Sequence, residues 1–353
     1  MKYYIITIHC IPNFGSVFQS YGLAEYLRKL GKDVEIIDYR PFYYKEGRRA
    51  FKNFVAKLLN FRSYKLQAKN YKQFVARELP LTKDVYRDKS ALQRFNTIDA
   101  VFISGGDQIW NSVHPSGKDD AYKLSFLDEQ RRIAFGSSMG RNSFSEDELK
   151  ALAAQVQKYS FIGLREQSTV SLLAKYVNFP VHHVVDPVLL LEKSEYARFV
   201  GEEPIIKEPY LVMYLSRPGN LLDEVIKFIA KKYNLKVVQA TGFKKKCKCD
   251  YHFKSTGPDE ILNLIYYSQF VVSASYHATL FSLLFGKQFC TLLPEAGTNT
   301  RIEDLLSYYN MKDRIITRIE DISNLESIIE FDEVQAKMDN IVKNSKALLN
   351  NAL

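Results

Sequence analysis

The sequence predicts an α/β protein of two domains, in which short parallel strands alternate with helices. The first observation is a recurring order of apolar run, polar loop and helical pattern, clearest in residues 270–289. The second is the length of 353 residues with 46% hydrophobic content, which is enough apolar material for two cores. The third is a charged, proline-containing stretch near residues 192–207, after which the pattern restarts. We therefore expect a domain boundary there.

Composition points to a cytoplasmic protein. No segment reaches the roughly 18 to 20 consecutive apolar residues of a membrane span, and the N-terminus has the pattern of a strand, not of a signal peptide. Cys247 and Cys249 have C-x-C spacing without a second ligand pair, which favours an exposed basic loop over a zinc site. Cys10 and Cys290 are expected in the core. We expect neither a metal nor a cofactor.

The net charge of +9 is concentrated in residues 45–77, which hold ten basic residues and one acid. Residues 51–59 have the spacing of an amphipathic basic helix, and Tyr71, Phe74, Val75 and Leu79 indicate a second helix. This surface is a solvated helical face, a contact with anionic lipid, or a nucleic-acid interface. Because no nucleic-acid recognition motif accompanies the charge, we expect no nucleic-acid partner.

The chain opens with a predicted β-α-β unit. A strand over residues 1–7 is followed by a loop with Asn13 and Gly15, a helix that runs to Gly31, and a strand over residues 34–37. The loop has neither the dinucleotide-binding glycine spacing nor the P-loop Gly-Lys-Ser/Thr. Asn13 and Gly15 remain candidates for contacts with a phosphate or a sugar.

A second polar loop follows the predicted strand over residues 99–103. Two glycines there allow close approach of the backbone, and polar side chains that can bind sugar hydroxyls come next, followed by the single tryptophan. The alternative is a tight turn with an indole in the core. The candidate residues are Gly105, Gly106, Asp107, Gln108 and Trp110.

A third strand end carries Arg165. Strands are predicted over residues 132–135 and 161–164, separated by a helix from Ser145 to Tyr159 with a capping box formed by Ser145 and Glu148. Arg165 follows the second strand, and its guanidinium can grip a phosphate or carboxylate. An ion pair with Glu166 is the simpler alternative.

The second half repeats the alternation, and its most informative stretch is residues 270–289. Strands are predicted over residues 210–215, 236–240, 270–272 and 291–293, and helices over 222–232, from 257, over 280–285, over 301–309 and from 333 to 353. His277 lies in the loop between the strand at 270 and its helix, where open α/β sheets bind ligands and helix N-termini attract anions. A capping or packing role for His277 is the alternative, and Ser275 is a good N-cap in either case.

Taken in order, these segments resemble the polysaccharide pyruvyl transferase family over most of the chain. The resemblance rests on the following seven segments: NFGSVFQSYGLAEYLRKLGKDVEIIDYRP, FVARELPLT, SGGDQIWN, GLREQS, VVDPVLLL, VVSASYHATLFSLLFGKQF and NTRIEDLL. It implies two Rossmann-like domains that face each other across a cleft, as in GT-B glycosyltransferases. The expected domains are residues 1–195, with a basic helical insertion at 45–90, and residues 205–330. The helix at 331–353 is expected to return to the first domain.

The resemblance implies transfer of a pyruvyl group from phosphoenolpyruvate to two hydroxyls of a sugar, forming a cyclic ketal. The family's central histidine matches His277. Many members carry an arginine two positions earlier, where this chain has Ser275, so Arg165 and Arg301 become the candidate anion ligands. We expect His277 and Asp107 to act in catalysis. The expected donor contacts are Arg165, Arg301, Ser275, Tyr276, Ala278 and Thr279.

The expected acceptor contacts come from the first domain, and the acceptor itself is a polysaccharide or lipid-linked sugar. In the latter case residues 45–77 would hold the enzyme peripherally at anionic lipid. Two other hypotheses remain: a GT-B glycosyltransferase that uses a nucleotide sugar, and a non-catalytic protein that binds glycans or anionic lipid. The acceptor residues are Asn13, Gly15, Gly105, Gly106, Gln108 and Trp110.

Overall fold

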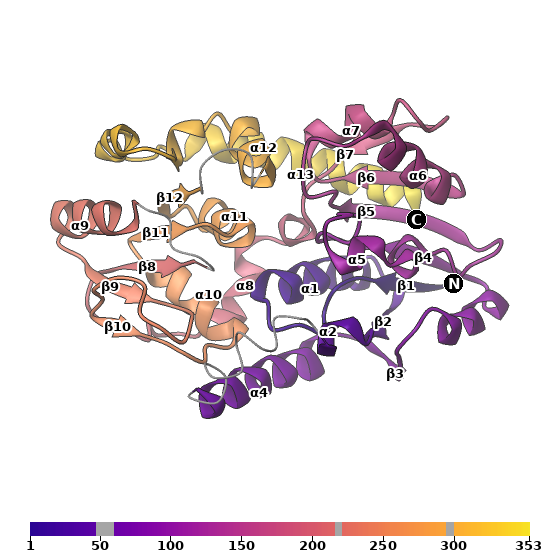
Figure 1. The fold of residues 1–353 in the computed structure, drawn as a ribbon, viewed down its shortest axis with the longest axis horizontal. Helices are drawn as coiled ribbons and strands as arrows, with labels where there is room; N and C mark the ends of the chain where they lie inside the picture. Colours follow the sequence, from indigo (N-terminus) through magenta and orange to yellow (C-terminus); the bar gives the residue numbers. More distant parts are fainter. Residues whose placement is uncertain (47–59, 216–220, 294–299) are drawn as a thin grey trace. The chain divides into compact units, whose positions relative to one another are not determined.

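The computed structural model describes residues 1–46, 60–215, 221–293 and 300–353, and it confirms the α/β class (Figure 1). The chain divides into two compact units, each built on its own parallel sheet. The first unit comprises Met1–Lys52, Gln73–Leu191 and Asp339–Leu353, and the second comprises Asn53–Lys72 and Glu192–Met338. Two long helices, α4 (Phe61–Glu78) and α13 (Asp332–Ala352), contribute residues to both units.

The first unit contains a sheet of seven parallel strands in the order β3-β2-β1-β4-β5-β6-β7. Gly22 lets helix α1 lie close to the backbone of η4, since a Cβ at this position would collide with Pro187. The other elements of this unit are β1 (Lys2–Ile6), α1 (Phe14–Lys29), β2 (Asp33–Tyr39), α2 (Tyr43–Glu46), β3 (Leu81–Tyr86), η2 (Ser90–Thr97), β4 (Ala100–Ser104), α5 (Pro115–Lys118), η3 (Asp120–Lys123), β5 (Arg131–Ser137), α6 (Glu146–Val156), β6 (Tyr159–Leu164), α7 (Gln167–Leu173), β7 (Val181–His183) and η4 (Pro187–Leu190).

The second unit contains a sheet of six parallel strands in the order β10-β9-β8-β11-β12-β13. Helix α9 packs on one face, while Tyr210 of β8 donates a hydrogen bond to the carbonyl of Leu264 in α10 on the other (Figure 1). The elements are α8 (Lys193–Val200), β8 (Tyr210–Tyr214), α9 (Leu222–Tyr233), β9 (Lys236–Gln239), β10 (Tyr251–His252), α10 (Pro258–Tyr267), β11 (Phe270–Ser273), α11 (Tyr276–Phe285), β12 (Gln288–Leu292), α12 (Thr300–Tyr308), η5 (Lys312–Arg314), β13 (Ile315–Ile316) and η6 (Ile319–Glu326).

Local sequence signals account for many of the element ends. Ser145 and Glu148 form the predicted capping box, in which each side chain accepts a hydrogen bond from the other residue's backbone N–H. Gly286 ends α11 in the left-handed conformation, with φ of 63°. The prediction that α6 continues to Tyr159 is wrong, because the helix ends at Val156 and Tyr159 begins β6 with its ring buried.

The basic segment is described in part. The helix predicted over residues 51–59 lies outside the described residues. The second helical pattern is confirmed in α4, whose Tyr71, Phe74, Val75 and Leu79 are buried. None of the helices in the described ranges combines the length and hydrophobicity needed to cross a bilayer.

The prediction of an exposed loop around Cys247 and Cys249 needs correction. Cys249 is buried in the core of the second unit, and Cys247 packs against the same core with its Sγ 3.5 Å from the Sδ of Met213. Cys290 is fully buried as expected, whereas Cys10 is half-buried. A thiol behaves as a small apolar group, so free cysteines are commonly buried.

Candidate active site

The short connection from β11 to α11, which places His277 in the first turn of the helix, lies where the strand order of the second sheet reverses. From the neighbouring pair β8 and β11, the chain proceeds outward to β10 on one side and to β13 on the other. In open α/β sheets, ligands bind at the carboxyl ends of the strands beside such a reversal. The prediction that His277 lies in a loop before a helix over residues 280–285 is wrong, because α11 begins at Tyr276 directly after the Ser275 cap. His277 is the second residue of α11, so it lies both at this strand end and at the positive end of a helix dipole.

Hydroxyl groups fix the conformation of this loop. Ser273 Oγ donates to the carbonyl of Tyr214 and accepts from the N–H of Ser275, both at 2.9 Å. Ser275 is the N-cap, as predicted, and its Oγ accepts from the N–H of Ala278. Thr279 Oγ1 lies 3.1 Å from the carbonyl of Ser275 and 3.0 Å from Thr291 Oγ1. The side chains of Ser275 and Thr279 therefore hold the loop that presents His277.

Arg301 belongs to the same cluster. Its guanidinium carbon lies 5.9 Å from the ring centroid of Tyr276, and the rings of Tyr276 and His277 are 5.2 Å apart and nearly perpendicular. The first turn of α11 contains no acidic residue. The second unit thus brings together His277 and its predicted companions in surroundings that favour an anion: Ser275, Tyr276, Ala278, Thr279 and Arg301.

Arg165 lies in the first unit and is held by two carboxylates. Its Nε is 2.9 Å from Glu166 Oε1, and its Nη1 is 2.7 Å from Asp186 Oδ2. All three residues are at least 95% buried. The simpler alternative, an ion pair with Glu166, is confirmed. Arg165, Glu166 and Asp186 together carry two negative charges and one positive charge, so this cluster does not favour binding of a further anion. The ion pair between Arg165 and Asp186 also joins the ends of β6 and β7.

The other first-unit candidates gather at the equivalent reversal, between β1 and β4. Asn13 is the N-cap of α1, and Gly15 lies in its first turn. Asp107 follows β4 with φ of 70°, and its carboxylate accepts from Ser16 Oγ at 2.5 Å and from the N–H of Gln108 at 2.8 Å. The helix N-terminus and the strand-end loop therefore meet through Ser16, as an open α/β sheet favours.

Gly105 and Gly106 pack closely against other residues of the first unit. A Cβ on Gly106 would lie 2.6 Å from Gln19 Oε1 and 3.1 Å from Pro187, while a Cβ on Gly105 would lie 3.1 Å from Thr7 Cβ. The close approach expected of Gly105 and Gly106 is thus explained by packing against α1, η4 and the end of β1.

The indole of Trp110 is part of the core. It is 2% exposed, its Nε1 donates to Ser104 Oγ at 3.2 Å, and it meets Tyr159 edge to face. The alternative of a core indole is therefore confirmed, and the indole N–H is not directed at a ligand. Gln108 directs its Oε1 to Asn111 Nδ2 at 2.8 Å.

The sequence matches one known protein family over most of its length. The pattern of the polysaccharide pyruvyl transferase family matches residues 13–294. The chain belongs to this family. The resemblance is confirmed, and the matched residues contain six of the seven segments, whereas NTRIEDLL at residues 299–306 lies beyond the match. Membership makes the chain a transferase enzyme of polysaccharide biosynthesis. No curated protein matches the chain.

Among the solved structures that resemble this chain, one is named as a UDP-GlcNAc 2-epimerase and another as an O-GlcNAc transferase. The UDP-GlcNAc 2-epimerase of Neisseria meningitidis, bound to UDP-GlcNAc, is 10% identical, covers 100% of this chain and 99% of its own, and has a TM-score of 0.51. The O-GlcNAc transferase of Thermobaculum terrenum is also 10% identical, covers 100% of this chain and 66% of its own, and has a TM-score of 0.50. At such identities the likeness shows the fold alone, a GT-B-like pair of parallel sheets.

Sequence reasoning missed one polar cluster of this chain, at the ends of β1 and β2. His9 is 1% exposed, and its Nε2 lies 3.0 Å from Asp38 Oδ1, which also accepts from Arg40. Burial alone would raise the pKa of Asp38, but hydrogen bonds from His9 and Arg40 lower it below its usual range. The rule that singled out Gly105 and His277 would have found His9, because it too follows a buried strand.

The structure shows no metal centre in its described ranges, where no three His, Cys, Asp or Glu side chains are grouped closely enough to hold an ion.

Proposed function

We propose that this enzyme transfers the pyruvyl group of phosphoenolpyruvate to two hydroxyls of one sugar, forming a cyclic ketal and releasing phosphate. Family membership supplies the pyruvyl transfer. The observation that supports the donor is the cluster of His277, Tyr276 and Arg301 at the N-terminus of α11. Phosphoenolpyruvate carries a phosphate and a carboxylate, and a helix N-terminus with a guanidinium stabilises both.

The chemistry requires proton transfers that an imidazole can perform. One sugar oxygen bonds to the central carbon of the donor while its methylene carbon takes up a proton. The bond to phosphate then breaks, and the second sugar oxygen bonds to the same carbon. The two sugar hydroxyls lose two protons in total. One proton is equivalent to the proton that the methylene carbon gains when it becomes a methyl group, and the other leaves on the released phosphate. We assign these transfers to His277 as general acid or base, because histidine changes charge near neutral pH.

The remaining roles follow from charge and position. Arg301 is the proposed donor ligand, since its guanidinium lies over the ring beside His277. Asp107, at the strand reversal of the first unit, is proposed to bind or deprotonate the acceptor, with Asn13 and Gly15 at the adjoining helix N-terminus. We propose a positioning role for Arg165, because Glu166 and Asp186 already neutralise it.

A lipid-linked acceptor is a further part of the proposal. Helix α4 exposes Arg62, Lys65, Lys69 and Lys72 together with the apolar Phe61 and Leu66, which are 62% and 48% exposed. Such a surface suits an anionic membrane, where each basic side chain contributes about 1 kcal/mol at low salt.

The decisive experiment supplies phosphoenolpyruvate with a panel of defined oligosaccharides. We expect release of phosphate that depends on the sugar, and a product whose mass increases by one pyruvyl group on a single sugar ring. A parallel thermal shift assay compares phosphoenolpyruvate with UDP- and GDP-sugars. Stabilisation by a nucleotide sugar alone, with transfer of a glycosyl group, would contradict the proposal and favour a glycosyltransferase.

A further inference from the structure

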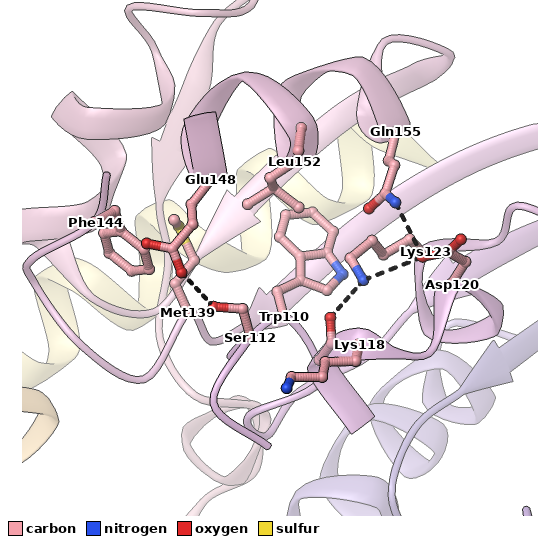
Figure 2. A pocket seen from close by; sticks show the side chains of 12 residues that line it. Trp110, Ser112, Lys118, Asp120, Lys123, Met139, Phe144, Glu148, Leu152 and Gln155 are labelled. Atoms are coloured by element: carbon pink, nitrogen blue, oxygen red, sulfur yellow. Dashed lines mark hydrogen bonds and ion pairs between the residues drawn. The ribbon is translucent and has the colours of Figure 1, made fainter. Parts of the chain in front are cut away.

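Two hollows in the first unit meet at Lys118. The larger has a volume of about 480 Å³ and lies between α5, η3 and α6, with Trp110 and Met139 beneath it (Figure 2). The smaller, of about 400 Å³, is lined by Tyr43, Val113, Pro115, Lys118 and Asp119. Both lie within the size range of small-ligand sites.

The larger hollow has an apolar side and a polar side. Met139, Phe144 and Leu152 form the apolar side. On the polar side, Asp120 Oδ1 accepts from Gln155 Nε2 at 2.9 Å and lies 3.8 Å from Lys123 Nζ (Figure 2). These polar groups hold one another in place, so a ligand would meet a site that is already ordered.

Lys123 forms the base of this polar side. Its ammonium donates to the carbonyl of Gly117 at 2.7 Å and is 4% exposed as a residue. Burial lowers the pKa of this ammonium, although Asp120 opposes the shift. A buried lysine that is anchored at two points is a built feature of the fold rather than a mobile surface charge.

Lys118 differs from Lys123, since its side chain is exposed and lines both hollows. The ammonium of Lys123 is held by the carbonyl of Gly117 and by Asp120 (Figure 2). In the smaller hollow, Asp119 accepts hydrogen bonds from Tyr39 and Tyr43, and Val113 is 66% exposed. The second hollow therefore repeats the combination of an apolar surface with a fixed carboxylate.

This combination fits sugar rings. A pyranose has apolar C–H faces and hydroxyls around its edge, so it needs an apolar wall with carboxylate, amide and ammonium groups beside it. A nucleotide base would need an open aromatic face, whereas the indole of Trp110 is 2% exposed and the ring of Phe144 has the guanidinium carbon of Arg141 over it, 4.5 Å from its centroid. Two adjoining hollows of this kind match two rings in succession.

We propose that these hollows bind two successive sugar units of the acceptor, with Lys118 contacting the region where the two are joined. The inference rests on the proposed function and adds where two neighbouring sugar rings of a glycan acceptor bind. A disaccharide fills both hollows at the entropic cost of a single binding event, so its affinity exceeds that of its component monosaccharide.

The test uses the whole enzyme and saturation-transfer NMR titrations. The probes are cellobiose, N,N′-diacetylchitobiose and lactose, each compared with its monosaccharides. Ala151→Trp places a large ring in the larger hollow, since Ala151 is exposed and lines it; Ala154→Trp is the matched control, because Ala154 is exposed on the same helix α6 and lies outside the lining.

We expect at least one disaccharide to bind tenfold or more tightly than its monosaccharides. This advantage should disappear in Ala151→Trp, fall in Lys118→Ala and persist in Ala154→Trp, with all three variants melting like the wild type. Disaccharide affinity that is equal in Ala151→Trp and Ala154→Trp would overturn the inference, as would a panel in which no disaccharide binds. Phosphate release from phosphoenolpyruvate is measured separately, so failure of the proposed reaction is distinguishable from failure of this site.

Discussion

At the scale of single residues, the proposed chemistry depends on the imidazole of His277. His277→Ala removes the group that exchanges protons with donor and acceptor, and we expect kcat to fall by about 10² to 10⁴. The loop should persist, because Ser273, Ser275 and Thr279 hold it through hydrogen bonds that do not involve the imidazole. Phosphate release gives kcat, and a melting curve gives stability. A large loss of stability would instead assign His277 a packing role.

Arg165 and Arg301 provide a matched pair of substitutions. Arg165→Met removes the positive charge that the buried carboxylates of Glu166 and Asp186 share, so we expect a loss of about 3 to 5 kcal/mol of unfolding free energy. Arg301 is only half-buried, so Arg301→Met should change stability little and raise the KM for phosphoenolpyruvate about ten- to hundredfold.

Denaturant unfolding and donor titration, run on both variants, separate the two roles. If Arg165→Met melted like the wild type and raised the donor KM, Arg165 would regain its place as an anion ligand.

The same pair shows how far the sequence could predict the site. Both arginines follow a predicted strand end, and the local sequence offered Glu166 as a partner for Arg165 without showing that the pair would be buried. The second partner of Arg165 is Asp186, which is 21 positions away and comes close only because β6 and β7 are neighbours. His277 and its N-cap were predictable because the strand, cap and helix that place them are contiguous in sequence.

At the scale of elements, central strands were predictable and edge strands were not. β1, β4 and β11 are apolar runs with nearly every residue buried. β3 lies at the edge of its sheet, and most of its residues are not buried. It therefore lacks the apolar run by which a strand is recognised, and β10 and β13 span two residues each.

Helix α4 carries the prediction that belongs to this scale. Lys65 and Lys69 are exposed one turn apart, and replacing both with glutamine should weaken binding to vesicles of anionic lipid about thirtyfold at low salt. The control replaces Lys227 and Lys231 of α9, which are equally spaced and exposed. Vesicle flotation at low and high salt measures the effect. Equal vesicle binding by the two double variants would mean that the basic residues of α4 form a solvated surface with no role in lipid binding.

At the scale of the whole molecule, the two units repeat one topology. In each sheet the first strand in sequence, β1 or β8, lies inside the sheet. The next two strands add on one side of it, and the later strands add on the other side. The candidate donor cluster and the polar cluster around Asp107 follow the equivalent strands β11 and β4. Such equivalence could not be derived from local sequence, because strand order depends on contacts between distant segments. It becomes visible only when both sheets are assembled.

The last helix, α13, ties the end of the described chain to the first unit. Within residues 339–353, Ser345 Oγ accepts from the N–H of Val185 at 3.0 Å, Asn350 Oδ1 accepts from Tyr26, and Leu349 is fully buried. Leu349→Ala leaves a cavity and should cost about 2 to 5 kcal/mol of unfolding free energy. Asn344→Ala, at an exposed position of the same helix, is the control.

Because Asp339–Leu353 groups with the first unit, we expect the damage from Leu349→Ala to be confined there. Hydrogen exchange followed by mass spectrometry should show faster exchange in the peptides of β1 and β7, while the peptides of β8 and β11 keep their protection. Asn344→Ala should exchange like the wild type throughout. Loss of protection spread equally over both sheets would mean that the two units unfold as one, and that α13 stabilises the entire chain rather than the first unit.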